Sequence, residues 1–452
     1  MAQDPESIAA ADTALAEELV ERATKAGAEA ADAVLLRSTA ISHSQRLGEL
    51  ERLEREESVD LGLRVLIGRR QAMVSTTDLD RDSLTALIER AVAMARVVPE
   101  DRWCGLAEPE QLATDWPDVD SHDPEEPAPE TLIERARICE EAARAVEGVT
   151  NSEGAEASWG STRMSLAASN GFRGTYVGSR HSLGVSVLAG DGLEMQRDYD
   201  FSSTVYGEDL EDPAEVGRRA GERAVRRLRP RKPRTAKLPV VFDPRIAPSL
   251  LRSLAGALSG AAVARGTSFL KDKLGERIFA PGIEVIDEPH RKRGLRSRPF
   301  DGEGLPTRRM AIIEDGRVTS WLLDLASARQ LGMTPTGHAA RGVSGPPGPS
   351  CSNLWLAPGN LSPEELIGEI EEGFYITEMI GMGVNPITGD YSRGASGYWI
   401  EKGELTYPVS EATVAGNLLS IYGALTPAND LEFRYGIDAP TLRIDGMTIA
   451  GS

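Results

Sequence analysis

The spacing of hydrophobic positions divides the first hundred residues into helices and strands. Apolar side chains recur at helical intervals from Ser7 to Lys25 among Ala and Glu, which predicts an amphipathic helix. Residues 33–36, 61–67 and 72–76 are rich in apolar and β-branched types and predict strands. A second helix is expected from a cap at Asp80 to about Arg96. This order of elements indicates an α+β unit.

The next unit combines two helical patterns with extended segments. Residues 129–146 and 212–228 have helical spacing, and Pro230 ends the second pattern. Small and β-branched residues fill the intervening segments, and Asn170-Gly171 and Gly190-Asp191-Gly192 are typical hairpin turns. These turns predict an antiparallel meander over the runs 157–170, 174–177 and 183–189.

From Lys237 onward the pattern changes to one buried strand, one helix and many short strands. KLPVVF at 237–242 predicts the strand, and 244–264 predicts a helix rich in Leu, Ala and Ser. Short extended runs between Gly and Pro follow, as in a curled or barrel-like sheet, at 283–286, 310–313, 317–323, 353–356, 397–400, 404–408 and 442–447. We therefore expect an α+β chain with N-terminal α/β units and a large, mainly antiparallel, barrel-like C-terminal domain that also carries helices.

Composition marks the expected domain boundaries. The segment 103–129 collects Pro, Asp and Glu, and it buries too little apolar surface for a core of its own. We expect an N-terminal α+β domain at 1–125, a central α/β meander at 126–235 and a β-rich C-terminal domain at 236–452. A chain of 452 residues fits two or three domains.

The charge of the chain argues against a nucleic-acid partner. Fifty Lys and Arg against 70 Asp and Glu give a formal net charge of −20, which repels phosphate backbones and anionic membranes. A basic run from Arg218 to Arg234 is the one feature that would allow a DNA-associated role. We favour a solvated helix end there, because the cations complement the helix dipole and no aromatic residues interleave with them.

The cysteines and the N-terminal sequence bear on the cellular compartment. Cys104, Cys139 and Cys351 are odd in number and far apart, which argues against a disulfide framework and against a CxxC motif. The N-terminus is acidic where a signal peptide would be basic, and no stretch approaches the ~18 apolar residues of a membrane span. We expect a cytoplasmic protein without a membrane segment.

No complete local catalytic motif is present in the sequence. The five histidines are scattered, so no His-pair zinc motif exists, and the nucleophile elbow, Walker A and dinucleotide motifs are also absent. Asp301 and Glu303 lie between glycines in a predicted loop, where carboxylates are suited to orienting a peptide amine or binding a cation. The alternative is a polar turn, which we favour from these residues alone.

Four long stretches of the third unit resemble the TldD/PmbA family of metallopeptidases, and specifically its PmbA, or TldE, branch. The stretches keep the order of the family and are non-repetitive: ARGTSFLKDKLGERI from Ala264, RPFDGEGLPTRRMAIIEDGRVTSWLLD from Arg298, EMIGMGVNPITGDYSRGASGYWIEKGELTYPVSEATVAGNL from Glu378, and the segments NDLEF and APTLRIDGMTIAG between Asn429 and Gly451. Before Lys237 only the layout of the two N-terminal units matches.

The resemblance implies a heterodimeric cytosolic protease. The TldD-type subunit of this family binds one catalytic zinc through an H-E-x-x-x-H helix and a distant cysteine, which the PmbA-type subunit lacks. Leu251 and Gly256 stand where the two histidines would be, Arg252 replaces the Glu, and 431–440 contains no cysteine. Leu and Gly donate no lone pair, and a guanidinium is no general base near neutral pH. We expect this chain to bind no metal or cofactor and the zinc to lie in a TldD-like catalytic partner.

The resemblance further implies a chamber for unfolded peptide substrates, because an extended peptide can pair with a sheet edge and a folded domain cannot. Two segments are candidates for the wall of a peptide cleft, with tight structural turns as the alternative. Their candidate residues are Phe300, Asp301, Glu303, Asn385, Asp390, Tyr391 and Arg393. The leading hypothesis is a non-catalytic subunit for peptide maturation or small-protein degradation. The alternatives are a peptide-binding homo-oligomer without proteolysis and an indirect modulator of DNA gyrase.

Overall fold

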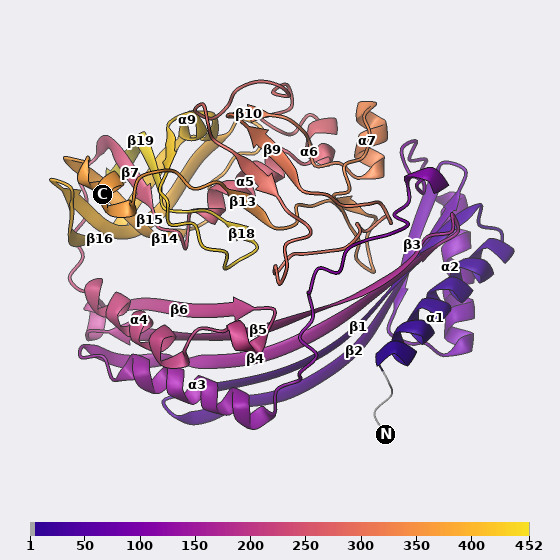
Figure 1. Cartoon of the computed structure of the whole chain (residues 1–452), viewed down its shortest axis with the longest axis horizontal. Helices are drawn as coiled ribbons and strands as arrows, with labels where there is room; N and C mark the ends of the chain where they lie inside the picture. The colour runs from indigo at the N-terminus through magenta and orange to yellow at the C-terminus, as the bar shows by residue number, and fades with distance from the viewer. Residues whose placement is uncertain (1–4, 452) are drawn as a thin grey trace.

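One long, curved sheet forms the base of the molecule. The computed structural model describes residues 5–451, and its first sheet has six antiparallel strands in the order β3-β2-β1-β4-β5-β6 (Figure 1). Strands β1 and β4 pair along 14 consecutive positions, from Asp32 opposite Ala168 to Gln45 opposite Ala155. The sheet therefore runs without interruption across the boundary that we predicted near residue 125. Its strands are β1 (Ala30–Arg46), β2 (Glu49–Ile67), β3 (Arg70–Thr76), β4 (Val149–Ala168), β5 (Arg173–Ala189) and β6 (Gln196–Thr204).

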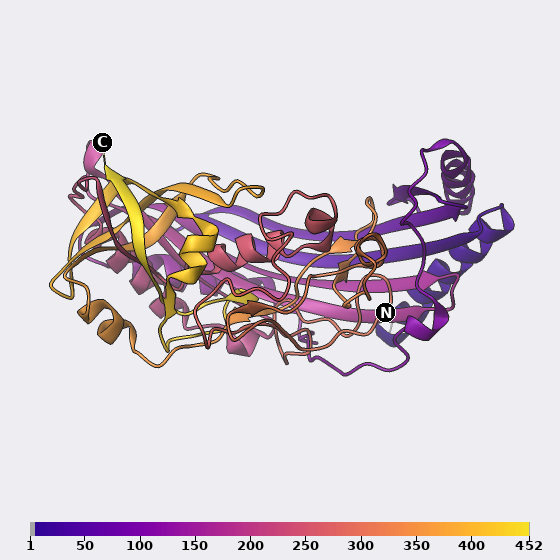
Figure 2. The ribbon, with the colours of Figure 1, turned by 90° about the horizontal axis from the view of Figure 1, so that it is seen from above.

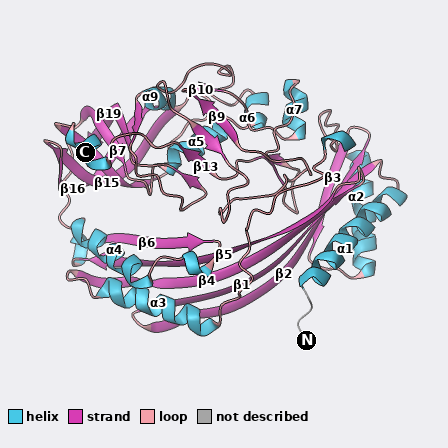
Figure 3. Cartoon of the chain, viewed as in Figure 1, coloured by secondary structure: helices cyan, strands magenta, loops and turns pink. Residues whose placement is uncertain are grey.

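Four helices cover one face of this sheet. Odd-numbered residues of β1 and β4 point to this face, as side chains alternate along a strand. Ala33 and Leu35 pack under one helix pair, and Ala157 and Trp159 pack under the other. The helices lie on the outer side of the curve (Figures 1 and 3), and they are α1 (Pro5–Lys25), α2 (Arg81–Val97), α3 (Pro129–Arg144) and α4 (Pro213–Arg226).

The C-terminal region contains a closed five-stranded barrel. Strand β7 pairs in parallel with β14 and antiparallel with β19, and β16 pairs with both β15 and β19, so the ring β7-β14-β15-β16-β19 has no open edge. The expected fold class is thereby confirmed. The barrel region comprises β7 (Ala236–Phe242), β14 (Glu372–Ile380), β15 (Asp390–Glu401), β16 (Glu404–Asn417), β17 (Leu425–Pro427), β19 (Leu442–Gly451), α8 (Pro363–Gly368) and α9 (Leu418–Gly423).

A second, smaller sheet accompanies the barrel, in the order β10-β9-β8-β13-β18. Its apolar side chains join those of the barrel in one continuous core. The elements of this part are β8 (Val285–Asp287), β9 (Met310–Glu314), β10 (Arg317–Val318), β11 (Ala339–Ala340), β12 (Gly348–Pro349), β13 (Leu354–Leu356), β18 (Ile437–Asp438), α5 (Pro248–Ala257), α6 (Gly260–Ala264) and α7 (Leu325–Leu331).

The C-terminal region sits in the concave face of the long sheet, and the long strands run beneath it (Figures 1 and 2). Even-numbered residues of β1 and β4, such as Val34 and Leu166, face it and pack against Phe300. The ring of Phe300 also contacts the rings of Trp116 and Tyr176, with centroids 4.9 and 5.4 Å apart. The two parts of the molecule are therefore held together by an apolar cluster.

Several expected elements differ in extent from those observed. The single helix predicted over 244–264 is two helices, because the backbone of Leu258 and Gly260 pairs with Leu322 and interrupts the helical ladder. The strand predicted over 317–323 is confined to Arg317–Val318, and Leu322 pairs with the junction of α5 and α6 instead of with β9. Strand β14 was not predicted, although its sequence EGFYITEMI is rich in aromatic and β-branched residues. The first half of β15 was not predicted either, since its Gly and polar residues resemble a loop.

Candidate functional site

A pocket in the C-terminal region, which we call the Arg252 pocket, has a volume of about 660 Å³. Helix α5 forms one wall, the connection between β14 and β15 forms the opposite wall, and Tyr199 of β6 borders it from the long sheet. Its size is in the range of small-molecule and peptide-terminus sites.

One stripe of helix α5 lines this pocket. Ser249, Arg252, Ser253 and Gly256 follow one another at the i, i+3, i+4 and i+7 spacing of a single helix face. Leu251 lies on the other side, 1% exposed within the core. Of the three positions compared with a zinc motif, only Arg252 and Gly256 therefore border the pocket.

The residues at these positions do not fit a zinc ion. Leucine and glycine side chains have no donor atom, and a guanidinium carries a positive charge and no lone pair to give. Residues 5–451 hold no group of three or more His, Cys, Asp or Glu that is arranged for a metal. We derive no metal-dependent step for this chain.

The charges around the Arg252 pocket are unbalanced. Arg245 donates to Asp198 Oδ1 at 2.9 Å, and Glu378 is paired with Arg227, so these charges are compensated. Arg252 and Arg393 form no ion pair with any residue of 5–451. The pocket thus keeps two uncompensated guanidinium groups.

Three polar atoms of residues that line the pocket have no hydrogen-bond partner within the part of the chain that the structure describes. These atoms are the hydroxyl of Ser249 and the Nε atoms of Arg245 and Arg393, and all three are shielded from solvent. Buried polar groups in native proteins are normally hydrogen-bonded. Donors left unpaired on α5 and on β15 indicate a surface that is suited to an acceptor group of a ligand.

Exposed apolar side chains lie at and near the pocket. Met382 and Val384 of the β14–β15 connection line it and are 103% and 36% exposed. Ile380 at the end of β14 and Ile387 in the same connection are 58% and 59% exposed. Exposed apolar residues that cluster in this way are typical of binding surfaces. Phe269 and Pro386 add apolar lining inside the pocket.

The predicted cleft residues of this segment have different positions. Arg393 lines the pocket, whereas Asn385 and Asp390 are exposed turn residues that bond within the loop. Tyr391 is 2% exposed in the barrel core, where burial raises its pKa to about 12. Among these four, Arg393 alone joins Arg252 and Gly256 at the pocket.

Phe300, Asp301 and Glu303 lie at a second location, the contact between the long sheet and the C-terminal region. Phe300 and Asp301 are each 1% exposed. The oxygens of Asp301 accept backbone N–H bonds from Glu303, Leu305 and Ala339 at 2.9, 2.9 and 3.1 Å. This geometry is that of a buried, structured turn.

A buried ion-pair network adjoins this turn. Asp32 of β1 accepts from Arg64 of β2 at 2.6 Å and from Arg341 at 2.8 Å. Burial acts to raise the pKa of Asp32, but the two guanidiniums outweigh it and lower the pKa. Gly62 makes this approach feasible, since a Cβ there would lie 2.3 Å from the carbonyl oxygen of Val343. We call Asp32, Arg64, Asp301, Glu303 and Arg341 the Glu303 cluster.

Glu303 holds a proton near neutral pH. Burial, followed by the neighbouring Asp301, raises its pKa to about 8, and its Oε2 accepts the N–H of Leu325 at 2.8 Å. Burial also raises the pKa of Asp301, but its three backbone donors favour the carboxylate. The pKa of both acids is therefore raised, and three backbone donors oppose the rise at Asp301, whereas one, from Leu325, opposes it at Glu303.

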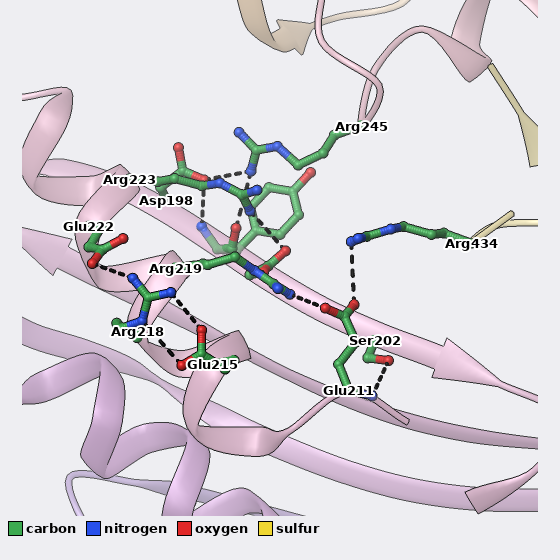
Figure 4. A network of polar contacts seen from close by, with 12 residues as sticks. Asp198, Ser202, Glu211, Glu215, Arg218, Arg219, Glu222, Arg223, Arg245 and Arg434 are labelled. Atoms are coloured by element: carbon green, nitrogen blue, oxygen red, sulfur yellow. Dashed lines mark hydrogen bonds and ion pairs between the residues drawn. The ribbon is translucent and has the colours of Figure 1, made fainter. Parts of the chain in front are cut away.

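Three of the four arginines of α4, Arg218, Arg219 and Arg223, are paired with acids, and Arg226 lies over the ring of Tyr398. Arg218 bonds to Glu215 and Glu222, and Arg219 bonds to Asp200 and Glu211 (Figure 4). Arg434, from the C-terminal region, reaches the same Glu211 at 3.3 Å. Arg223, Arg227, Lys232 and Arg234 of the basic run are ion-paired as well, so acids neutralise much of the run that was considered for DNA binding.

Known sequences and structures match the chain along most of its length. The PmbA/TldA metallopeptidase domain 1, central domain and C-terminal domain match residues 31–95, 122–228 and 235–451. The metalloprotease PmbA of Escherichia coli O157:H7 is 38% identical over 94% of this chain and 92% of its own. The chain belongs to the PmbA/TldD metallopeptidase family, in its PmbA branch.

Other relatives agree with this assignment. A metalloprotease PmbA homologue of Haemophilus influenzae is 35% identical over 96% of this chain and 94% of its own. A crystal structure from Bacteroides thetaiotaomicron, named as a candidate modulator of DNA gyrase, has a TM-score of 0.89 at 30% identity and covers 97% of this chain and 98% of that chain. TldE from Thermococcus kodakarensis shares the fold, with a TM-score of 0.86 at 22% identity over 97% of this chain and all of its own.

Sequence reasoning missed several residues of the Arg252 pocket. Arg245, Ser249, Phe269 and Met382 come from three separate segments, and no local motif links them. The helical spacing of Ser249, Arg252 and Gly256 was the one sequence signal for the pocket. It places three small or polar residues on one face of an otherwise apolar helix.

Proposed function

We propose that this chain is the non-catalytic, PmbA/TldE-like subunit of a TldD-type zinc metallopeptidase. The observation that carries the proposal is the side-chain chemistry of α5, where the positions compared with zinc ligands are Leu251, Arg252 and Gly256. A subunit of this kind completes a chamber around a partner's zinc, and the partner supplies the H-E-x-x-x-H helix. Small-protein degradation and peptide maturation are the processes that such a chamber would serve.

The substrates proposed are unfolded or extended peptides. The exposed apolar loop between β14 and β15 is suited to contacting side chains that are buried in folded proteins. The free cysteines Cys104, Cys139 and Cys351 support a cytoplasmic location, since disulfides are rare in that compartment. No helix within residues 5–451 combines the length and apolar character that a bilayer crossing requires.

Zinc content and peptidase activity test the proposal together. The chain is purified alone and after co-expression with a TldD-type subunit, and both samples are assayed for bound zinc and for cleavage of an unstructured peptide. We expect zinc and cleavage only when the partner is present. Stoichiometric zinc together with peptide hydrolysis by the chain alone would contradict the proposal.

A matched control assigns the activity to one subunit. The partner is produced with the first histidine of its H-E-x-x-x-H helix replaced by alanine, while this chain stays unchanged. The assembly should then persist in size-exclusion chromatography but lose zinc and cleavage. If the two chains never associate, the peptide-binding homo-oligomer becomes the better account.

A further inference from the structure

We infer that the Arg252 pocket binds the C-terminal carboxylate of a peptide whose last residue is apolar. The inference deepens the proposed function, on which it rests for the choice of a peptide as ligand. It assigns a binding role to the surface where other members of the family would place a metal motif. The argument uses the charges, the unpaired donors and the shape of the pocket.

The first step is the charge of the ligand. Arg252 is exposed at the pocket and Arg393 lies beside it, and neither has an acidic partner among residues 5–451. The rest of the molecule has a large excess of acid, with a net charge of −20. Two guanidiniums left uncompensated in such a chain favour an anion at this one place, and Arg forms strong charge-assisted bonds with carboxylates.

The second step concerns the donors. The Ser249 hydroxyl and Arg393 Nε–H are buried without acceptors. An unpaired buried donor costs free energy, and a carboxylate oxygen would satisfy it. Arg245 also lines the pocket, and its Nε likewise lacks a hydrogen-bond acceptor within residues 5–451, but its charge is compensated by Asp198 and Asp243. It is therefore not the primary contact that we infer for the carboxylate.

The third step concerns the body of the ligand. Apolar side chains surround the arginines, from Ile246 and Phe269 inside the pocket to Met379, Met382 and Val384 at the β14–β15 connection. Inorganic phosphate would leave this apolar surface in contact with water. A peptide end that carries an apolar side chain next to its carboxylate can contact both the apolar lining and the arginines. The methionines of the lining adapt to side chains of different shape.

Peptide-binding measurements on the full chain alone test this inference. The probe is a fluorescently labelled, Gly- and Ser-rich heptapeptide ending in Leu with a free carboxylate, and its affinity is measured by fluorescence anisotropy. The same peptide with a C-terminal amide and one ending in Asp are the comparison ligands. We expect the free acid ending in Leu to bind roughly tenfold or more tightly than either, as charged hydrogen bonds contribute that much.

Variants identify the residues responsible. Arg252→Gln and Arg393→Gln should each weaken binding of the free acid roughly tenfold and reduce its advantage over the amide. Arg308→Gln is the matched control, because Arg308 is an exposed arginine outside the pocket. It should leave all affinities unchanged.

The results separate this inference from the proposed function. Equal binding of acid and amide by the wild-type chain overturns the inference, and so does an acid preference that survives in both arginine variants. This wild-type comparison needs no variant to fold. Zinc-dependent cleavage with the TldD-type partner is a separate measurement. It tests the proposed subunit role independently of the peptide-binding result.

Discussion

The Arg252 pocket and the Glu303 cluster both combine arginines with polar groups, but their charges are balanced differently. In the Glu303 cluster, Arg64 and Arg341 are enclosed and share Asp32. In the Arg252 pocket, Arg252 and Arg393 face a cavity, and neither has an acidic partner among residues 5–451. Removing one partner of a buried ion pair destabilises the fold, so the paired arginines contribute to stability. An arginine without an acidic partner remains able to form a charge-assisted hydrogen bond with a ligand. We therefore expect the first region to govern stability and the second to govern binding.

The largest effect is expected when the Glu303 cluster loses its central acid. Asp32→Ala leaves two buried guanidiniums without their carboxylate, and the free energy of unfolding should fall by about 3–5 kcal/mol. Urea denaturation followed by circular dichroism measures the change. Asp272→Ala, at an exposed aspartate, should stay within about 0.5 kcal/mol of wild type. A loss below about 1 kcal/mol for Asp32→Ala would contradict the structural role of the cluster.

The next effect concerns pH and Glu303. Because its pKa is raised to about 8, the folded chain holds a proton that the unfolded chain releases above about pH 4.5. The free energy of unfolding of wild type should therefore fall as pH rises between these values, and Glu303→Gln should remove that fall. The difference between the two proteins should grow by at most about 1.4 kcal/mol per pH unit.

Urea titrations at half-unit pH steps measure this difference. Glu314→Gln is the control, because Glu314 is exposed and lies outside the cluster. Its pH dependence should follow wild type. Parallel pH profiles for Glu303→Gln and wild type would show that Glu303 is ionised in the fold.

A smaller effect on stability is expected at the Arg252 pocket. Arg252 is exposed and has no ion-pair partner within the described range 5–451, so Arg252→Gln should change the free energy of unfolding by less than about 0.5 kcal/mol. The same variant should lose its preference for a peptide with a free C-terminal carboxylate. Urea titration and anisotropy on one preparation give both values. A large loss of stability would remove the contrast between the two regions.

The smallest effect is expected on α4. Arg218 pairs with Glu215 and Glu222 on the solvent side of the helix, where surface ion pairs contribute little. Arg218→Gln should leave the urea midpoint unchanged, and neither protein should retard a DNA duplex in a gel-shift assay at physiological salt. Salt-dependent DNA binding that weakens in the variant would restore the nucleic-acid alternative.

The barrel and the long sheet differ in how far the sequence predicted them. Alternating segments such as 72–76 and hairpin turns such as Asn170-Gly171 marked strands of the sheet, because local periodicity encodes which side chains are buried. The first half of β15 was missed, since its polar and glycine residues are accommodated by pairing with β14 and β16 rather than by local preference. The interrupted helix at 258–260 depended on Leu322, more than 60 residues away.

The sequence by itself determined the family, the α+β class and the chemistry missing at Leu251, Arg252 and Gly256, because side-chain identity alone decides whether a donor atom exists. Only the tertiary structure decided which candidate residues meet. It separated Phe300, Asp301 and Glu303 from Arg393 and placed Arg393 with Arg252 beside one cavity. The physical reason is that burial and ion pairing depend on segments distant in the chain, so whether an arginine is compensated is a property of the fold.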